Sequence, residues 1–145
     1  YWHPVAGVDA LEREPVVPIR LLGQDWVLYR DLEGRYGLVD RRCAHRGADL
    51  SYGFVEREGL RCNYHGWRYD ARGRCAEQPF DDVAAPQARF GDRVAIGAGR
   101  VEAKAGLLWA YVGPEPAPLL PDWEAFGWKN GFVQAVFAEV PCNWL

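Results

Sequence analysis

Two short segments of the chain combine cysteine with histidine, whose sulfur and nitrogen atoms are common ligands of transition metals. Cys43 and His45 are separated by one residue, and Cys62 and His65 are separated by two. Sixteen residues lie between His45 and Cys62. These positions use two of the three histidines and two of the four cysteines in the chain. The spacing predicts two loops that face each other, each offering one thiolate and one imidazole to a metal centre.

Two thiolates and two imidazoles are the ligand set of a Rieske [2Fe–2S] centre, in which two histidines replace two cysteines on one iron. We expect Cys43 and Cys62 to bind the ferric iron. His45 and His65 would bind the iron that changes valence. Zinc is the main alternative, because two Cys and two His also form structural zinc sites. Zinc fingers, however, group their cysteines together and their histidines together. Each pair here mixes the two residue types, which favours iron–sulfur over zinc.

The residues around both pairs resemble the Rieske domain of aromatic-ring-hydroxylating oxygenases, and in particular the large subunits of the phthalate-dioxygenase-like group. The resemblance covers nearly the whole chain and rests on the segments YWHPVA, RLLGQDWVLYRD, CAHRGADL, LRCNYHGWRYDARGRC, GLLWAYVGP and PCNWL. Ala44 departs from this group, whose members often carry proline there. The Rieske proteins of respiratory complexes resemble another pattern, with an extra cysteine in each loop, and this chain has none just after either pair.

The resemblance implies an electron-transfer domain that accepts electrons from a reductase carrying flavin or an iron–sulfur cluster. The electrons would pass to a mononuclear Fe(II) in a catalytic domain, held by two His and a carboxylate. In this family, that iron belongs to a neighbouring subunit of a homotrimer. We expect this chain to serve an O₂-dependent oxidoreductase while lacking the catalytic iron site itself. A stand-alone Rieske ferredoxin, which only carries electrons, is the alternative, and a zinc-stabilised interaction module is a weaker one.

The composition is that of an ordinary globular protein, with 145 residues of which 49% are hydrophobic and 26% charged. The net charge of −3 gives no electrostatic footprint for nucleic acid or an anionic membrane. We find neither a membrane-spanning apolar run nor a signal peptide, and therefore expect a cytoplasmic protein. The chain contains no methionine and ends within an apolar segment. We expect it to be a piece of a longer protein.

Short runs of β-branched and aromatic residues, with turn signals at intervals of about 8–12 residues, predict an all-β fold. We expect a Rieske-type antiparallel β-sandwich or barrel with a cluster-binding subdomain of two loops. Residues 1–8 are expected to form an arm, 11–15 a polar connector and 79–90 an irregular segment. The Rieske domain is predicted over residues 1–122, and the start of a truncated catalytic domain over residues 123–145. The predicted strands are 19–22, 26–30, 36–40, 59–61, 67–70, 74–77, 93–96, 100–103, 107–112 and 132–140.

Residues next to the ligand pairs are expected to tune the centre. Trp67 follows the second pair and would shield the cluster or pack in the core. In the respiratory type a serine at this place donates a hydrogen bond to a cluster sulfur, which raises the reduction potential. Trp67 has no hydroxyl, so we expect a potential toward the low end of the roughly −150 to +300 mV Rieske range. Tyr64 is the remaining candidate donor near the pair. Cys75 and Cys142 are expected to be small buried side chains rather than ligands.

Overall fold

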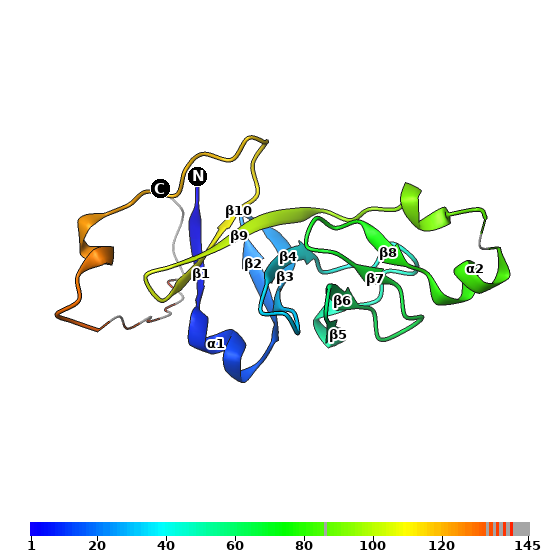
Figure 1. Cartoon of the computed structure of the whole chain (residues 1–145), viewed down its shortest axis with the longest axis horizontal. Helices are drawn as coiled ribbons and strands as arrows, with labels where there is room; N and C mark the ends of the chain where they lie inside the picture. The colour runs from blue at the N-terminus through cyan, green and yellow to red at the C-terminus, as the bar shows by residue number, and fades with distance from the viewer. Residues whose placement is uncertain (86, 133, 135, 137, 139, 141–145) are drawn as a thin grey trace.

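The computed structural model describes residues 1–85, 87–132, 134, 136, 138 and 140. Within them, ten antiparallel strands form a six-stranded sheet in the order β1-β10-β9-β4-β3-β2 and a four-stranded sheet in the order β5-β6-β7-β8 (Figure 1). The all-β prediction is confirmed. The strands are β1 His3–Gly7, β2 Val16–Leu21, β3 Gln24–Arg30, β4 Tyr36–Asp40, β5 Phe54–Glu56, β6 Gly59–Arg61, β7 Arg68–Tyr69, β8 Cys75–Glu77, β9 Ala98–Lys104 and β10 Leu107–Tyr111.

Strand β3 is buried on both faces, because it separates two hydrophobic cores. Trp26 and Leu28 point into one core, which they share with residues of β1, β4 and β10. Val27 and Tyr29 point into the other. A strand buried on both faces has a continuous apolar run instead of an alternating pattern, and the segment WVLY meets that requirement.

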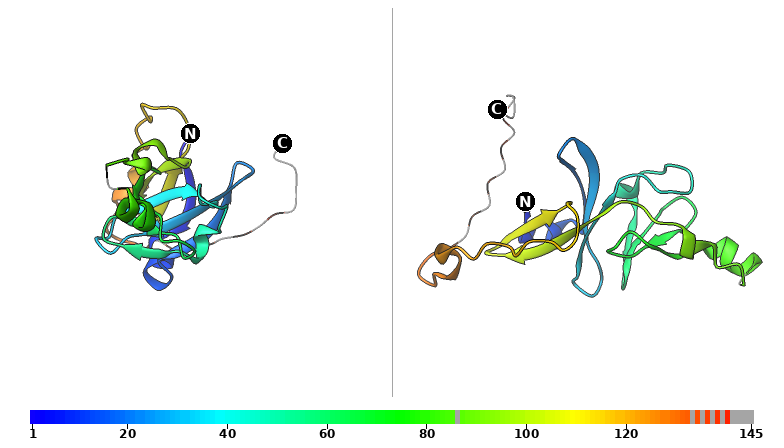
Figure 2. Two further views of the ribbon diagram at one scale, coloured as in Figure 1. Left: turned by 90° about the vertical axis from the view of Figure 1, so that its right-hand side faces the viewer. Right: turned by 90° about the horizontal axis from the view of Figure 1, so that it is seen from above.

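The second core joins the large sheet to the small one and contains both loop cysteines. Cys43 and Cys62 pack there with Leu60 of β6 and Tyr69 of β7. The four-stranded sheet therefore lies beside the large sheet, as two further views show (Figure 2). The thiols of the predicted ligands are part of the packing that holds the two sheets together.

Three segments differ from the sequence prediction. The expected N-terminal arm is strand β1, which pairs with β10 more than one hundred residues later, as in the pair His3 and Ala110. Residues 11–13 of the expected connector form the end of helix α1, Val8–Arg13, which carries an i,i+4 ion pair and buries Leu11. The expected irregular segment begins with helix α2, Pro79–Ala84. Proline at the first helical position and aspartate in the first turn are helix-start signals that its loop-like composition obscured. None of the described helices is long and apolar enough to cross a membrane.

The remaining segments connect or follow the sheets. The described residues include three short 3₁₀ helices, η1 Leu50–Tyr52, η2 Phe90–Arg93 and η3 Glu124–Gly127. The strand predicted over 93–96 is reduced to one isolated bridge between Ala95 and Arg74. The strand predicted over 132–140 lies partly outside the described residues, and Cys142 and the PCNWL ending lie wholly outside them. These last expectations remain predictions.

Candidate metal centre

The first cluster loop, residues 41–53, follows β4 and buries its cysteine through a tight backbone turn. The Gly47 N–H donates to the Cys43 carbonyl at 2.9 Å, and the Cys43 N–H donates to the Ala48 carbonyl at 2.9 Å. Gly47 has a φ of 66°, in the left-handed region that glycine adopts readily. The turn leaves Cys43 only 3% exposed in the core and places His45 at an exposed tip.

The second cluster loop, residues 62–67, repeats this turn between β6 and β7. The Gly66 N–H donates to the Cys62 carbonyl at 3.1 Å, and the Cys62 N–H donates to the Trp67 carbonyl at 2.8 Å. Gly66 has a φ of 77°. Cys62 is 3% exposed, and His65 is half-buried. In both loops the left-handed glycine is the fourth residue after the cysteine.

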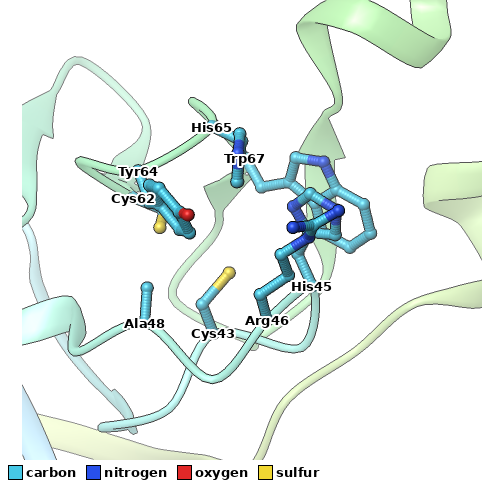
Figure 3. Close-up of a pocket in the computed structure, with 8 residues that line it drawn as sticks. All are labelled: Cys43, His45, Arg46, Ala48, Cys62, Tyr64, His65 and Trp67. Carbon is cyan, nitrogen blue, oxygen red and sulfur yellow. The ribbon is translucent and has the colours of Figure 1, made fainter.

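The two loops face each other, and the structure brings the four predicted site residues together (Figure 3). The ring centroids of His45 and His65 are 4.6 Å apart, with the rings inclined by 65°. The loops line a small hollow, partly open to solvent. Its lining residues are Cys43, His45, Arg46, Ala48, Cys62, Tyr64, His65 and Trp67.

Aromatic rings flank both histidines. The Trp67 indole stacks on His45 with the ring centroids 4.7 Å apart and the planes within 8°. Trp67 also packs against the core that holds the cysteines, so both roles considered for it fit the structure. The ring centroid of the exposed Tyr64 lies 3.9 Å from the ring centroid of His65. The second loop thus covers one face of the first-loop histidine.

A hydroxyl that the sequence reasoning missed reaches a cysteine sulfur. The Tyr69 oxygen lies 3.2 Å from the Cys43 sulfur and accepts the Ala44 N–H at 3.1 Å. Either group can be the donor while Cys43 is a thiol, whereas a Cys43 thiolate can only accept, so that the Tyr69 hydroxyl is then the donor. Tyr69 is fully buried, and this burial, with the hydrogen bond to Cys43, raises the pKa of Tyr69. The side chain therefore remains a donor at neutral pH. Tyr64, the donor considered from the sequence, is exposed instead.

Burial also shifts the pKa values of both residues of the second pair, Cys62 and His65. It raises the pKa of the Cys62 thiol, while the nearby backbone N–H groups of Tyr64 and His65 lower that pKa. Burial, followed by the nearby charges of His45 and Arg46, lowers the pKa of His65. A neutral imidazole is the form that binds metals.

The donor set fits a metal centre. The Nδ1 atom of His65 is buried and has no hydrogen-bond partner within the described part of the chain. A buried nitrogen without a partner costs free energy, which a metal bond would offset. Among the described residues, no three His, Cys, Asp or Glu side chains converge as a single ion would require. Each iron of a binuclear Rieske cluster takes only two protein ligands, one pair of cysteines or one pair of histidines.

Residues 1–88 match the family model of the Rieske [2Fe-2S] domain. The chain belongs to this family. The chain is 59% identical over its 145 residues to the 5,5'-dehydrodivanillate O-demethylase oxygenase subunit of Sphingobium sp. (strain NBRC 103272 / SYK-6), covering 100% of the chain and 34% of that protein. It is 34% identical to the phthalate 4,5-dioxygenase oxygenase subunit of Pseudomonas putida, covering 99% of the chain and 33% of that protein.

A solved structure supports the same relationship. The structure of NdmA from Pseudomonas putida CBB5 superposes on the Rieske domain with a TM-score of 0.73 at 31% identity, covering 86% of this chain and 38% of that one. The chain thus spans about a third of the length of the curated relatives it matches, 34% and 33% in the two cases. The resemblance to oxygenase subunits is confirmed, and the cofactor of the family is a [2Fe–2S] cluster.

An ion pair braces the first cluster loop of this Rieske domain. The guanidinium of Arg41 lies 2.6 Å and 2.8 Å, through two nitrogens, from one oxygen of Asp49. The other Asp49 oxygen accepts the backbone N–H and the hydroxyl of Ser51, at 3.0 Å and 2.7 Å. The Arg41 hydrogen bond lowers the pKa of Asp49 to about 2, aided by Ser51 and opposed by burial. The carboxylate therefore ties together both ends of the loop around Cys43.

Proposed function

We propose that Cys43, His45, Cys62 and His65 hold a [2Fe–2S] cluster and that the chain is the electron-entry domain of a Rieske non-haem iron oxygenase. The observation that carries this proposal is the convergence of two matching loops, with cysteines in the core and histidine rings 4.6 Å apart. When bound, the cluster supplies one-electron chemistry at a potential set by its ligands and by hydrogen bonds to sulfur.

The surrounding residues divide the work of a protected electron path. Cys43 and Cys62 fix the buried side of the site, where the Tyr69 hydroxyl would donate to the Cys43 sulfur once it is a thiolate. His45 lies at the exposed tip and would be the point of closest approach for an electron donor or acceptor. Trp67 excludes water from one face of that imidazole.

The partners follow from the oxygenase relatives. We infer that a reductase carrying flavin or an iron–sulfur cluster donates the electrons, and that a mononuclear Fe(II) in the catalytic domain of a neighbouring subunit accepts them. A homotrimer is the assembly in which we expect this transfer. A cytoplasmic location suits Cys43, Cys62 and Cys75, which form no disulfide among the described residues, as is usual in a reducing compartment. The 59% identity to an O-demethylase oxygenase subunit makes O-demethylation the reaction to test first for the whole protein.

We retain the domain boundary predicted from the sequence, with the Rieske domain over 1–122 and a catalytic domain beginning at 123. Lys104 of β9 pairs with Asp122 at 2.8 Å, which ties the segment before the boundary to the sheet. Just after the boundary, the ring centroids of Trp123 and Phe126 lie 5.7 Å and 6.0 Å from the ring centroid of Trp109. Under this proposal, the aromatic contact joins the two domains.

The proposal is tested by assembling the chain with iron and sulfide and adding a flavin- and iron–sulfur-containing reductase with NADH under anaerobic conditions. We expect two irons and two sulfides per chain, and bleaching of the visible absorption by one electron. A coloured protein that dithionite reduces but several such reductases do not would contradict the partner assignment. A colourless protein holding one zinc would contradict the cluster itself and support the interaction module.

A further inference from the structure

The four-stranded sheet β5-β6-β7-β8 (Figure 1) contains the two strands that flank the second cluster loop. Four charged side chains form a network on this sheet. Arg61 of β6 lies directly opposite Arg68 of β7, an arrangement of like charges that destabilises a sheet unless it is compensated. Glu77 of β8 and Glu56 of β5 each pair with both arginines, and the contact between Glu56 and Arg68 is the longest at 3.8 Å. The two glutamates thus balance the two arginines, and we call these four residues the charge network.

Arg61 makes one contact that leaves the charge network. Its guanidinium donates to both carboxylate oxygens of Glu56 and to Glu77, and its remaining terminal nitrogen donates to the Gly66 carbonyl at 2.6 Å. Its side chain is only 21% exposed. These acceptors surround the planar guanidinium, whose rigid fork of donors holds several oxygens at once.

The Gly66 carbonyl is a sensitive point of the second cluster loop. Gly66 separates His65 from Trp67, and its own N–H already donates to the Cys62 carbonyl at 3.1 Å. With Arg61 bound to the carbonyl, the peptide groups on both sides of this left-handed glycine are fixed.

We propose that Arg61 is a positioning residue of the metal centre, which orients His65 and, through Trp67 stacked on His45, the imidazole of the other loop. This inference rests on the proposed function, because it concerns the ligands of that same site. The positive charge of Arg61 is not sufficient for this role. The guanidinium binds the Gly66 carbonyl and both glutamates at once, which the single ammonium group of a lysine would not do.

Arg68 provides a matched control within the same network. It is also an arginine on the adjacent strand and it also pairs with Glu77, at 2.8 Å. Its other side-chain hydrogen bond goes to the Glu58 carbonyl at 2.7 Å, on the turn before β6 and away from the metal site. A change at Arg68 therefore weakens the sheet and removes a positive charge without releasing Gly66.

The experiment compares Arg61→Lys, Arg61→Gln and Arg68→Gln with the wild-type chain, each assembled with iron and sulfide. The readouts are the reduction potential, the width of the electron paramagnetic resonance lines of the reduced protein, and the melting temperature. We expect both Arg61 variants to lower the reduction equilibrium constant by at least about threefold, or about 28 mV for one electron, and to broaden the lines. Arg68→Gln is expected to lower the melting temperature with the potential and line width unchanged.

The outcomes separate the possible roles of Arg61. If Arg61→Lys keeps the wild-type potential and line width, or if Arg68→Gln shifts them equally, Arg61 acts through charge or sheet stability and the inference is overturned. Should Arg61→Gln fail to fold, Arg61→Lys decides between these outcomes because it keeps the charge. A wild-type chain without histidine-ligated iron would overturn the proposed function as well, whereas a normal wild-type centre with unchanged Arg61 variants overturns only the inference.

Discussion

The two cluster loops share one backbone turn and differ in what surrounds it. In each, the glycine four residues after the cysteine has a left-handed φ, 66° at Gly47 and 77° at Gly66, and donates its N–H to the cysteine carbonyl. The tip of the first loop, residues 44–47, is exposed. The second loop is half-buried from His65 onward, where it contacts Arg61 and Pro79.

This difference shows that the turn and its surroundings control different parts of the site. The turn buries the cysteine in both loops, since Cys43 and Cys62 have the same small exposure. The position of the histidine within the turn and the neighbouring elements then decide how exposed each imidazole is. His45 is the second residue after its cysteine and lies at the tip, whereas His65 is the third and lies against the glycine. One backbone motif thereby provides one exposed and one sheltered imidazole.

The largest effects are expected at the cysteines, where the loops are alike. Cys43→Ser and Cys62→Ser should each abolish the visible absorption and the bound iron of the assembled chain. Changes to the hydrogen-bond partners of metal ligands typically lower metal affinity by about 10–100-fold. Loss of a ligand itself should lower it further. Iron and sulfide content after assembly measures it.

Cys75 is the matched control for this comparison. It is a free thiol, buried in the same core, and burial raises its pKa to about 11. Cys75→Ser should therefore keep the full iron content. Retention of iron by Cys62→Ser, or its loss from Cys75→Ser, would show that the ligand set is assigned wrongly.

The two glycines should differ in their tolerance of a methyl group. A non-glycine residue in the left-handed region costs roughly 1–2 kcal/mol. A Cβ at position 47 meets nothing within 4 Å, whereas a Cβ at Gly66 lies 3.3 Å from the Pro79 ring. We expect Gly47→Ala to lower the free energy of unfolding by about 1–2 kcal/mol and Gly66→Ala by about 2–3 kcal/mol. Denaturant unfolding of both variants measures the difference, and a larger loss for Gly47→Ala would contradict the account.

The hydrogen bond from the Tyr69 hydroxyl to the Cys43 sulfur should raise the reduction potential of the cluster. Tyr69→Phe removes a donor to the Cys43 sulfur, and a hydrogen bond of about 1 kcal/mol corresponds to a potential lower by about 40 mV for one electron. Tyr64→Phe is the control, because its exposed ring lies beside His65 rather than at that sulfur. Redox titration of both variants decides between them. If only Tyr64→Phe lowers the reduction potential, Tyr64 is the hydrogen-bond donor, as considered from the sequence, and the assignment to Tyr69 is wrong.

The smallest effect concerns the ion pair that braces the first loop. The pKa of Asp49 is lowered to about 2, so its carboxylate stabilises the fold above the ordinary pKa and loses this effect as the pH falls toward 2. We expect Asp49→Asn to lower the free energy of unfolding by about 1 kcal/mol at pH 7. Below pH 2, where Asp49 is protonated in the folded state as well, the variant and the wild type should be equally stable. Unfolding at both pH values tests this, and a deficit that persists in acid would point to packing instead of charge.

The fold class and the four candidate ligands were accessible from the sequence because their signals are local. Mixed Cys and His pairs are visible within a few residues, and the strands predicted at 36–40 and 59–61 coincide with β4 and β6. Helices α1 and α2 were missed because six residues are too few for a helical period to emerge. Helix α1 depends instead on one ion pair and on the burial of Leu11.

The residues that tune the site could not be predicted, because their contacts depend on strand pairing. Tyr69 reaches Cys43 across 26 residues, and Arg61 reaches Glu77 across 16. Strand β1 was predicted to be an arm for the same reason, because its partner strand β10 lies more than one hundred residues later in the chain. A pattern read along the chain identifies donors such as Tyr69 and Arg61 only once the register between strands is known.

The central claim is that one histidine from each loop binds the same iron. It is tested most directly by electron nuclear double resonance of the dithionite-reduced chain assembled with iron and sulfide. The account predicts couplings to two imidazole nitrogens, one of which disappears when His45 is replaced by Cys and the other when His65 is replaced. A reduced cluster without nitrogen couplings, or couplings that survive both replacements together, would contradict it.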